Sequence, residues 1–142
     1  ALQSKPKLQL CNPSPSSWGQ GGFHNYWLNE SNAWIVHQLS KAGREMVNIC
    51  TKGMEKESNI KIIKQAGREL LLCQSSDWSF ILKAGTTTEL ARERINLHLK
   101  RFWILINAIK DKEIIEQNVL EDIEKEDCIF PLISPIDWKR KI

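Results

Sequence analysis

A polar patch follows an apolar helical stripe in the middle of the chain, in the segment LLLCQSSDW at residues 70–78. When the stripe is continued at helical spacing, the next position that it reaches is Asp77. Gln74 shares this face, and Ser76 and Trp78 flank the carboxylate on either side. Carboxylate and amide groups bind sugar hydroxyls, and aromatic faces stack on pyranose rings. The patch therefore has the side chains that a carbohydrate-binding site needs.

Asp77 allows two interpretations, because a carboxylate on a buried stripe is unfavourable unless it is paired or reaches a wet cavity. In the structural interpretation, a neighbouring arginine or a loop N–H satisfies the carboxylate. In the functional interpretation, Asp77 and Gln74 face a cleft and bind a sugar. Both interpretations place Asp77 toward the bundle or toward a cleft at its edge. The chemistry of these residues alone does not choose between them.

A glycine-rich loop near the N-terminus carries Trp18 and Trp27, in the segment SSWGQGGFHNYWLN at residues 16–29. Closely spaced glycines are unfavourable inside a helix, and the segment lacks the alternation of a half-buried strand. The tryptophans either seal one end of the fold or present exposed rings to a ligand. The loop is therefore a second candidate binding segment, with both interpretations open.

The charge and hydropathy of the chain argue against two classes of partner. The 142 residues include 20 basic and 17 acidic side chains, for a net charge of +3. This small excess supports a nucleic-acid partner only weakly, and none is expected. The longest apolar run, at residues 102–106, is far shorter than the roughly 20 residues of a membrane span, so no membrane partner is expected. The start of the chain also lacks the apolar segment of a signal peptide.

The cysteines and histidines are Cys11, Cys50, Cys73, Cys128, His24, His37 and His98. No two cysteines form a CxxC pair, and no histidine stands at ligand spacing from a cysteine, so neither a metal nor a cofactor is expected. Cys50 and Cys73 fall on apolar helical stripes, as buried reduced thiols do. These features predict a reducing, cytoplasmic location.

Hydrophobic periodicity predicts helices over residues 32–52, 58–83 and 89–110, followed by a shorter helix through Ile115, Val119 and Ile123. Ser31 or Asn32 is expected to cap the N-terminus of the first helix, and a threonine among residues 86–88 is expected to cap that of the third. Gly53 is expected to end the first helix and Gly85 the second. The predicted apolar stripes are Ile35, Leu39, Ala42, Met46 and Ile49; then Ile63, Ala66, Leu70, Cys73, Phe80 and Ala84; then Ala91, Ile95, Phe102, Leu105 and Ile109.

These elements predict an all-α fold, an antiparallel bundle of three long helices and a shorter one. The chain forms a single domain over residues 1–142, with a loop segment at 1–29, the bundle at 30–127 and a proline-containing tail at 128–142. The tetrapeptide AGRE occurs at residues 42–45 and 66–69, and both Ala-Gly pairs predict close helix contacts.

The ordered motifs SSWGQGGFHNYWLN, NAWIVHQL, GRELLLCQSSDW and GTTTELARERINLHLKRF together resemble glycoside hydrolase family 57. They are most similar to the C-terminal helical domain of its 1,4-α-glucan branching enzymes, and the resemblance covers about residues 10 to 138. The chain departs from the family pattern at Gln20 in the loop and at Leu90, where a tyrosine is common.

The resemblance implies roles for particular residues. Trp18 and Trp27 match the two tryptophans that line the glucan-binding cleft, and Asp77 matches an aspartate of the last conserved region, which faces the sugar. Gln74, Ser76 and Trp78 belong to that same region. The catalytic carboxylates of the family lie in a large N-terminal (β/α) barrel, so no catalytic residue is expected in this chain. The chain would then be a C-terminal piece of a larger enzyme, inactive alone.

The function implied by the resemblance is branching of 1,4-α-glucan by a retaining mechanism, with α-glucan and the enzyme's own N-terminal barrel as partners. One alternative is an α-amylase-like hydrolase of the same family. A helical nucleic-acid or protein interaction module would instead show a clustered basic face, whereas Lys and Arg alternate with Glu and Asp along every predicted helix. A purely structural helical cap would leave Asp77 unexplained.

Overall fold

The described part of the chain is helical, which confirms the predicted all-α bundle. The structure, a computed structural model, describes residues 10–52, 57–111 and 115–139 and contains no strand in these ranges. Its α-helices there are α1 (Ala33–Thr51), α2 (Glu57–Cys73), α3 (Ser76–Ala84), α4 (Thr88–Asp111) and α5 (Gln117–Glu126). None of these helices is long and apolar enough to span a bilayer.

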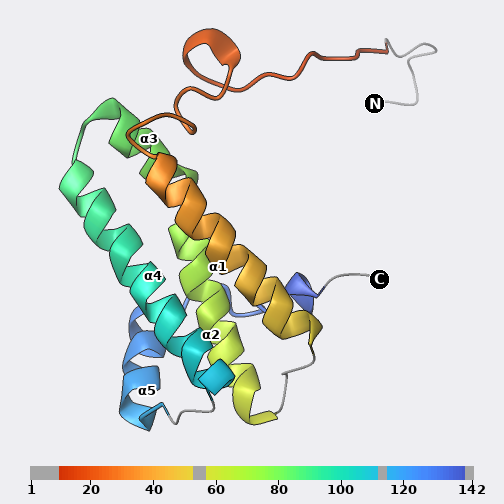
Figure 1. The fold of residues 1–142 in the computed structure, drawn as a ribbon, viewed down its shortest axis with the longest axis vertical. Helices are drawn as coiled ribbons and strands as arrows, with labels where there is room; N and C mark the ends of the chain where they lie inside the picture. Colours follow the sequence, from red (N-terminus) through yellow and green to blue (C-terminus); the bar gives the residue numbers. More distant parts are fainter. Residues whose placement is uncertain (1–9, 53–56, 112–114, 140–142) are drawn as a thin grey trace, which may run out of the picture.

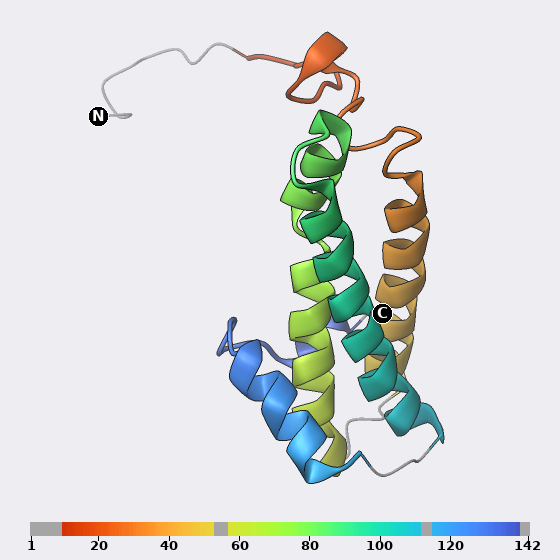
Figure 2. The ribbon, with the colours of Figure 1, turned by 90° about the vertical axis from the view of Figure 1, so that its left-hand side faces the viewer.

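Helices α2 and α4 lie antiparallel along the centre of the molecule (Figure 1) and form its most extensive helix contact. Figure 2 shows α1 on one side of this pair and α5 on the other. The facing stripes are buried as periodicity predicts: Ile63, Ala66, Leu70 and Cys73 on α2, and Ala91, Ile95, Phe102, Leu105 and Ile109 on α4. Burying one large apolar side chain contributes about 1.5–3 kcal/mol, so this contact supplies much of the fold's stability.

Helix α1 packs on the central pair through the predicted stripe. Four residues of the stripe are buried, namely Ile35, Ala42, Met46 and Ile49, and Leu39 is half-buried. The predicted side-chain cap is wrong. Asn32 precedes α1, but its side chain makes no capping bond to the helix. Its carbonyl oxygen Oδ1 instead accepts a hydrogen bond from the N–H of Asn29 at 2.9 Å, because the amide is directed at the loop. Gly53 lies outside the described residues.

The predicted helix over residues 58–83 is divided, which is the main departure from the sequence-based fold. Helix α2 ends at Cys73, and α3 begins at Ser76 after an extended residue, Ser75. The break changes the helical phase, so Phe80 is half-buried and Ala84 is exposed, although both were placed on the buried stripe. Gly85 then ends α3 in the left-handed conformation with φ 78°, as predicted.

Helix α5 confirms the predicted short helix, with a buried face that differs from the predicted one at Val119. Leu120 and Ile123 are buried, whereas Val119 is 37% exposed. Ile115 lies before the helix and packs against the core. Ile123 is therefore buried as predicted, and Leu120 takes the buried position that was expected of Val119.

The tail, which we define from here on as residues 127–139, folds back onto the bundle, and its short 3-10 helix η3 (Pro135–Trp138) contacts both α1 and α2. A Cβ atom at Gly67 would lie 2.5 Å from the ring of Trp138 and 3.1 Å from Ile133. Gly67 therefore makes a close contact as predicted, but its partner is the tail and not another long helix. The matching Gly43 on α1 has nothing within 4 Å of a Cβ, so the predicted contact there is wrong.

Candidate functional site

Four rings gather where the N-terminal loop meets α3, and we name Trp18, Tyr26, Trp27 and Phe80 the aromatic cluster. The Trp18 ring centroid lies 6.0 Å from that of Tyr26, 6.1 Å from Trp27 and 5.8 Å from Phe80. The rings of Tyr26 and Phe80 stack at 5.0 Å with an interplanar angle of 16°. The cluster therefore joins the loop to the end of the helical bundle seen at the top of Figure 1.

The exposure of the cluster bears on its role. Trp18 is 71% exposed, while Tyr26 and Trp27 are half-buried. Among the described residues, neither the buried core nor the half-buried side chains packed on it include these rings. A ring that seals the core of this domain would be covered, so Trp18 does not have that role within the described residues.

Hydrogen bonds within the loop and a glycine at position 19 bring the loop close to the ring of Tyr26. The N–H of Ser17 donates to the carbonyl of Gly22 at 2.8 Å, and the N–H of His24 donates to Ser17 Oγ at 2.6 Å. Gly19 has φ 108°, and a Cβ there would lie 2.8 Å from the ring of Tyr26. A side chain at this position would be strained and would displace that ring, so Gly19 is required for the cluster to form.

Two asparagines hold the base of the loop, and sequence reasoning missed both. Asn29 Nδ2 donates to the carbonyl of Asn25 at 2.8 Å. Asn32 is fully buried, and its Nδ2 donates to the carbonyls of Tyr26 at 2.9 Å and Ser79 at 3.3 Å. These bonds reach across the chain from the start of α1 to the loop and to α3. Hydrophobic periodicity offers no signal for them, because they are made by polar groups outside the helices, and the bond to Ser79 joins segments 47 residues apart.

Asp77 does not point into the bundle, so that one of the two expected orientations is wrong, while a position facing a cleft at the bundle's edge stays a prediction. It is exposed in the first turn of α3, where Ser75 Oγ donates to its Oδ2 at 3.4 Å. A negative charge there is favourable because the helix N-terminus is positive. Asp77 lies three residues before Phe80 of the aromatic cluster, and this spacing puts both residues on one face of α3.

The other predicted residues lie in different settings. Ser76 is exposed at the start of α3. Trp78 is half-buried against the core, and its Nε1 donates to the carbonyl of Leu72 at 2.8 Å, which satisfies the end of α2. Gln74 is exposed and lines an open groove of about 820 Å³ beside α1 with, among others, Arg44. The patch at residues 74–78 is thus divided between the exposed start of α3, the core and the groove.

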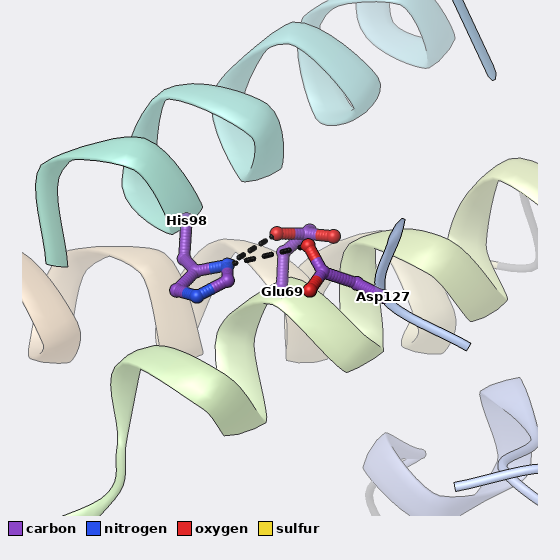
Figure 3. Close-up of side chains that lie close together, drawn as sticks. All are labelled: Glu69, His98 and Asp127. Carbon is purple, nitrogen blue, oxygen red and sulfur yellow. Dashed lines mark hydrogen bonds and ion pairs between the residues drawn. The ribbon is translucent and has the colours of Figure 1, made fainter. Parts of the chain in front are cut away.

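A buried polar cluster between α2, α4 and the tail was not predicted (Figure 3). His98 on α4 places Nδ1 2.8 Å from Oε2 of Glu69 on α2 and 3.6 Å from Oδ2 of Asp127 in the tail. Gln65 Nε2 donates to Glu69 Oε1 at 2.8 Å, and Arg101 Nη1 donates to Asp127 Oδ2 at 2.6 Å. The sequence holds one signal for it, because Gln65 and Glu69 lie one helical turn apart beside the buried stripe.

The composition of this cluster is that of a possible cation site. The ligand atoms of Glu69, His98 and Asp127 lie within 4.8 Å of one another. Each carboxylate is nevertheless already paired, one with His98 and Gln65 and the other with Arg101. A guanidinium beside a candidate ligand oxygen opposes a bound cation, so the geometry supports a structural network that ties α2, α4 and the tail together.

A family model described as 1,4-alpha-glucan branching enzyme, C-terminal, matches residues 38–138 of the chain. The chain belongs to this family. The 1,4-alpha-glucan branching enzyme TK1436 of Thermococcus kodakarensis is 34% identical over 119 residues, which are 80% of this chain and 18% of that relative. A probable 1,4-alpha-glucan branching enzyme of Mycobacterium tuberculosis is 29% identical over 91 residues, 59% of this chain and 17% of the relative.

Solved structures agree with this family membership. The GH57-type branching enzyme from Pyrococcus horikoshii matches with a TM-score of 0.80 and 28% identity, over 89% of this chain and 25% of that one. The alpha-amylase AmyC from Thermotoga maritima matches with a TM-score of 0.79 and 29% identity, over 99% of this chain and 26% of that one. The resemblance to glycoside hydrolase family 57 is confirmed. The chain spans only about a quarter or less of these relatives.

Proposed function

We propose that this domain serves an enzyme that makes α-1,6 branches in 1,4-α-glucan. Its family and the branching enzymes that match most of the chain support this activity. In the proposed retaining mechanism, one carboxylate of an N-terminal barrel forms a glycosyl-enzyme intermediate, and a second acts as acid and then as base. The partners of the domain are then the α-glucan and that barrel.

The role of this domain in the reaction is to hold the glucan, and the 71% exposure of Trp18 is the observation that carries this proposal. The ring is exposed on one side, while Tyr26 and Phe80 support it at centroid distances of 6.0 Å and 5.8 Å. A ring fixed in advance loses little conformational entropy when a pyranose stacks on it. Trp27 meets Trp18 edge-on at 72° and extends the aromatic surface.

The polar residues near the cluster contribute hydrogen bonds in this proposal. The exposed carboxylate of Asp77 accepts bonds from sugar hydroxyls, and Ser76 beside it donates or accepts one. Trp78 offers the uncovered part of its ring, since its N–H is used by Leu72. Gln74 binds sugar only along the groove beside α1. By placing the acceptor chain, the domain favours attack by a sugar hydroxyl over attack by water.

A second candidate activity is α-glucan hydrolysis. It is favoured by the similarity to the alpha-amylase AmyC, which extends over 99% of this chain. The two activities differ in whether a sugar hydroxyl or water attacks the intermediate. Incubation of the parent enzyme with amylose separates them, because branching forms α-1,6 linkages without new reducing ends and hydrolysis releases reducing ends.

The binding role is tested with Trp18→Ala in the parent enzyme, measured by its affinity for maltoheptaose. Loss of one stacking face is expected to weaken binding about tenfold, which corresponds to about 1.4 kcal/mol. The matched control is Phe23→Ala, because Phe23 is 75% exposed in the same loop and lies outside the aromatic cluster. Equal affinities for Trp18→Ala, Phe23→Ala and the unchanged enzyme would refute the proposal.

A further inference from the structure

Asn32 occupies an unusual place for a residue that precedes a helix. The residue is 0% exposed, and its amide uses both of its donors and accepts one hydrogen bond. The Nδ2 group donates to the carbonyls of Tyr26 and Ser79, at 2.9 Å and 3.3 Å. Its Oδ1 accepts the N–H of Asn29 at 2.9 Å. The amide therefore connects two points of the loop with one point of α3.

This arrangement is specific to an amide. A buried polar group is unfavourable without partners, whereas an apolar side chain would fill the same space with no such requirement. A helix cap does not explain it either, because the Asn32 side chain makes no bond to the first turn of α1. Unlike an apolar side chain, the amide fixes the backbone of Tyr26 relative to that of Ser79, because it donates a hydrogen bond to each.

The same junction is fixed a second time by ring stacking. Phe80 follows Ser79 directly, and its ring stacks on that of Tyr26 at 5.0 Å and an interplanar angle of 16°. The backbone bond and the ring contact thus join the same two short segments. Trp18 rests on both rings of this stack, at 6.0 Å from Tyr26 and 5.8 Å from Phe80.

We infer that Asn32 is a positioning residue for the aromatic cluster. It fixes the loop that carries Trp18 relative to the helix that carries Asp77, so that both side chains meet one glucan in a set geometry. The separation of Trp18 and Asp77 depends on this junction because they lie on different segments. The inference rests on the proposed function only for the identity of the ligand, since the ordering of the loop is measured without glucan.

The first test compares amide hydrogen exchange in the 142-residue chain with and without Asn32→Asp. This variant keeps the size and the acceptor but replaces both N–H donors with an oxygen that faces two carbonyls. Exchange over residues 17–29 is expected to rise about tenfold or more, because buried hydrogen bonds are lost, while residues 95–106 of α4 are unaffected. The control is Asn107→Asp, the same change at an exposed position of α4.

A second variant keeps the test decisive if Asn32→Asp does not fold. Phe80→Leu removes the ring stack on Tyr26 but retains an apolar side chain, and it is expected to raise loop exchange in the same range. Unchanged loop exchange in a folded Asn32→Asp, or in Phe80→Leu where Asn32→Asp does not fold, would overturn the inference. Both outcomes are independent of whether the chain binds glucan.

The last test separates positioning from a general structural role, by a double-mutant cycle on maltoheptaose affinity in the parent enzyme. Asn32→Asp and Trp18→Ala are each expected to weaken binding about tenfold, and together little more than either alone, because they act through one contact. Additive losses would overturn the inference. If Trp18→Ala alone has no effect, the proposed glucan role fails, while the exchange experiment still decides whether Asn32 orders the loop.

Discussion

Glu69 on α2 and His98 on α4 face each other across the core, with 2.8 Å between Oε2 and Nδ1. Their side chains are almost entirely buried, at 0% and 4% exposure for the residues. Asp127 of the tail lies 3.6 Å from the same histidine nitrogen and is held by Arg101. Each of these polar groups has a hydrogen-bond or ion-pair partner within the cluster. The cluster therefore connects the tail to α2 and α4 without leaving one of its own polar groups unpaired in the core.

Glu69→Leu is expected to destabilise the chain by about 1–3 kcal/mol, because His98 Nδ1 and Gln65 Nε2 each lose a buried partner. Urea unfolding followed by circular dichroism measures the change. Glu93→Leu is the matched control: Glu93 is exposed on α4, and a surface substitution is expected to stay within about 0.5 kcal/mol. Adding His98→Leu should recover part of the loss, since it removes the stranded polar group. A double variant less stable than Glu69→Leu would contradict this account.

Gly67 and Gly43 are expected to respond in opposite ways to alanine, although both belong to an AGRE segment. At Gly43 the added methyl meets nothing within 4 Å, so better helix propensity should stabilise the chain by about 0.5–1 kcal/mol. At Gly67 it would lie 2.5 Å from the Trp138 ring, so the tail must shift and stability should fall by about 1 kcal/mol or more. Thermal unfolding compares the two variants, and a stabilised Gly67→Ala would show that the tail is not packed there.

The central fold could be predicted because it depends on local periodicity. Ile63, Ala66 and Leu70 repeat at helical spacing, and burial of their stripe overrides weaker preferences. The break at Ser75 was missed because Phe80 and Ala84 continue the spacing of the stripe beyond the polar residues 74–77. There the Ser-Ser-Asp sequence starts a new helix, and the ring of Trp78 satisfies the carbonyl of Leu72. Local polar chemistry outweighed the continuing stripe.

The candidate site could be predicted only in part. Trp18 and Trp27 stand out because large aromatic side chains are unusual in a glycine-rich loop. Asn32 and Phe80 do not stand out, since a polar residue before a helix and an aromatic residue within one are common. Their roles arise from contacts between segments far apart in the sequence, such as the bond from Asn32 to Ser79. Periodicity within one segment contains no information on such contacts.

Cys73 should resist alkylation in the folded chain. Burial raises the pKa of its thiol from 9.0 to about 12, and the nearby Glu69 carboxylate adds to the shift. Because the thiolate is the reactive form, iodoacetamide at pH 8 should label the exposed Cys11 and Cys128 and leave Cys73 unmodified, as mass spectrometry can measure. Since the folded pKa is raised, the thiol's contribution to stability is complete below pH 9.0 and declines as the pH rises toward about 12. Labelling of Cys73 as fast as Cys128 would contradict its burial.

Asp77→Ala should reduce activity of the parent enzyme far more than stability of the chain. Asp77 is exposed in the first turn of α3, so its removal strands no buried partner and loses only a helix-dipole interaction of about 0.3–1 kcal/mol. If the carboxylate binds sugar, branching activity should fall about tenfold or more, equivalent to about 1.4 kcal/mol of transition-state stabilisation. Glu89→Ala is the matched control, because Glu89 is an exposed acidic residue in the first turn of α4 and should lose the same dipole interaction. Thermal unfolding and branching assays on both variants decide the matter: equal activities would mean that Asp77 only favours the start of its helix.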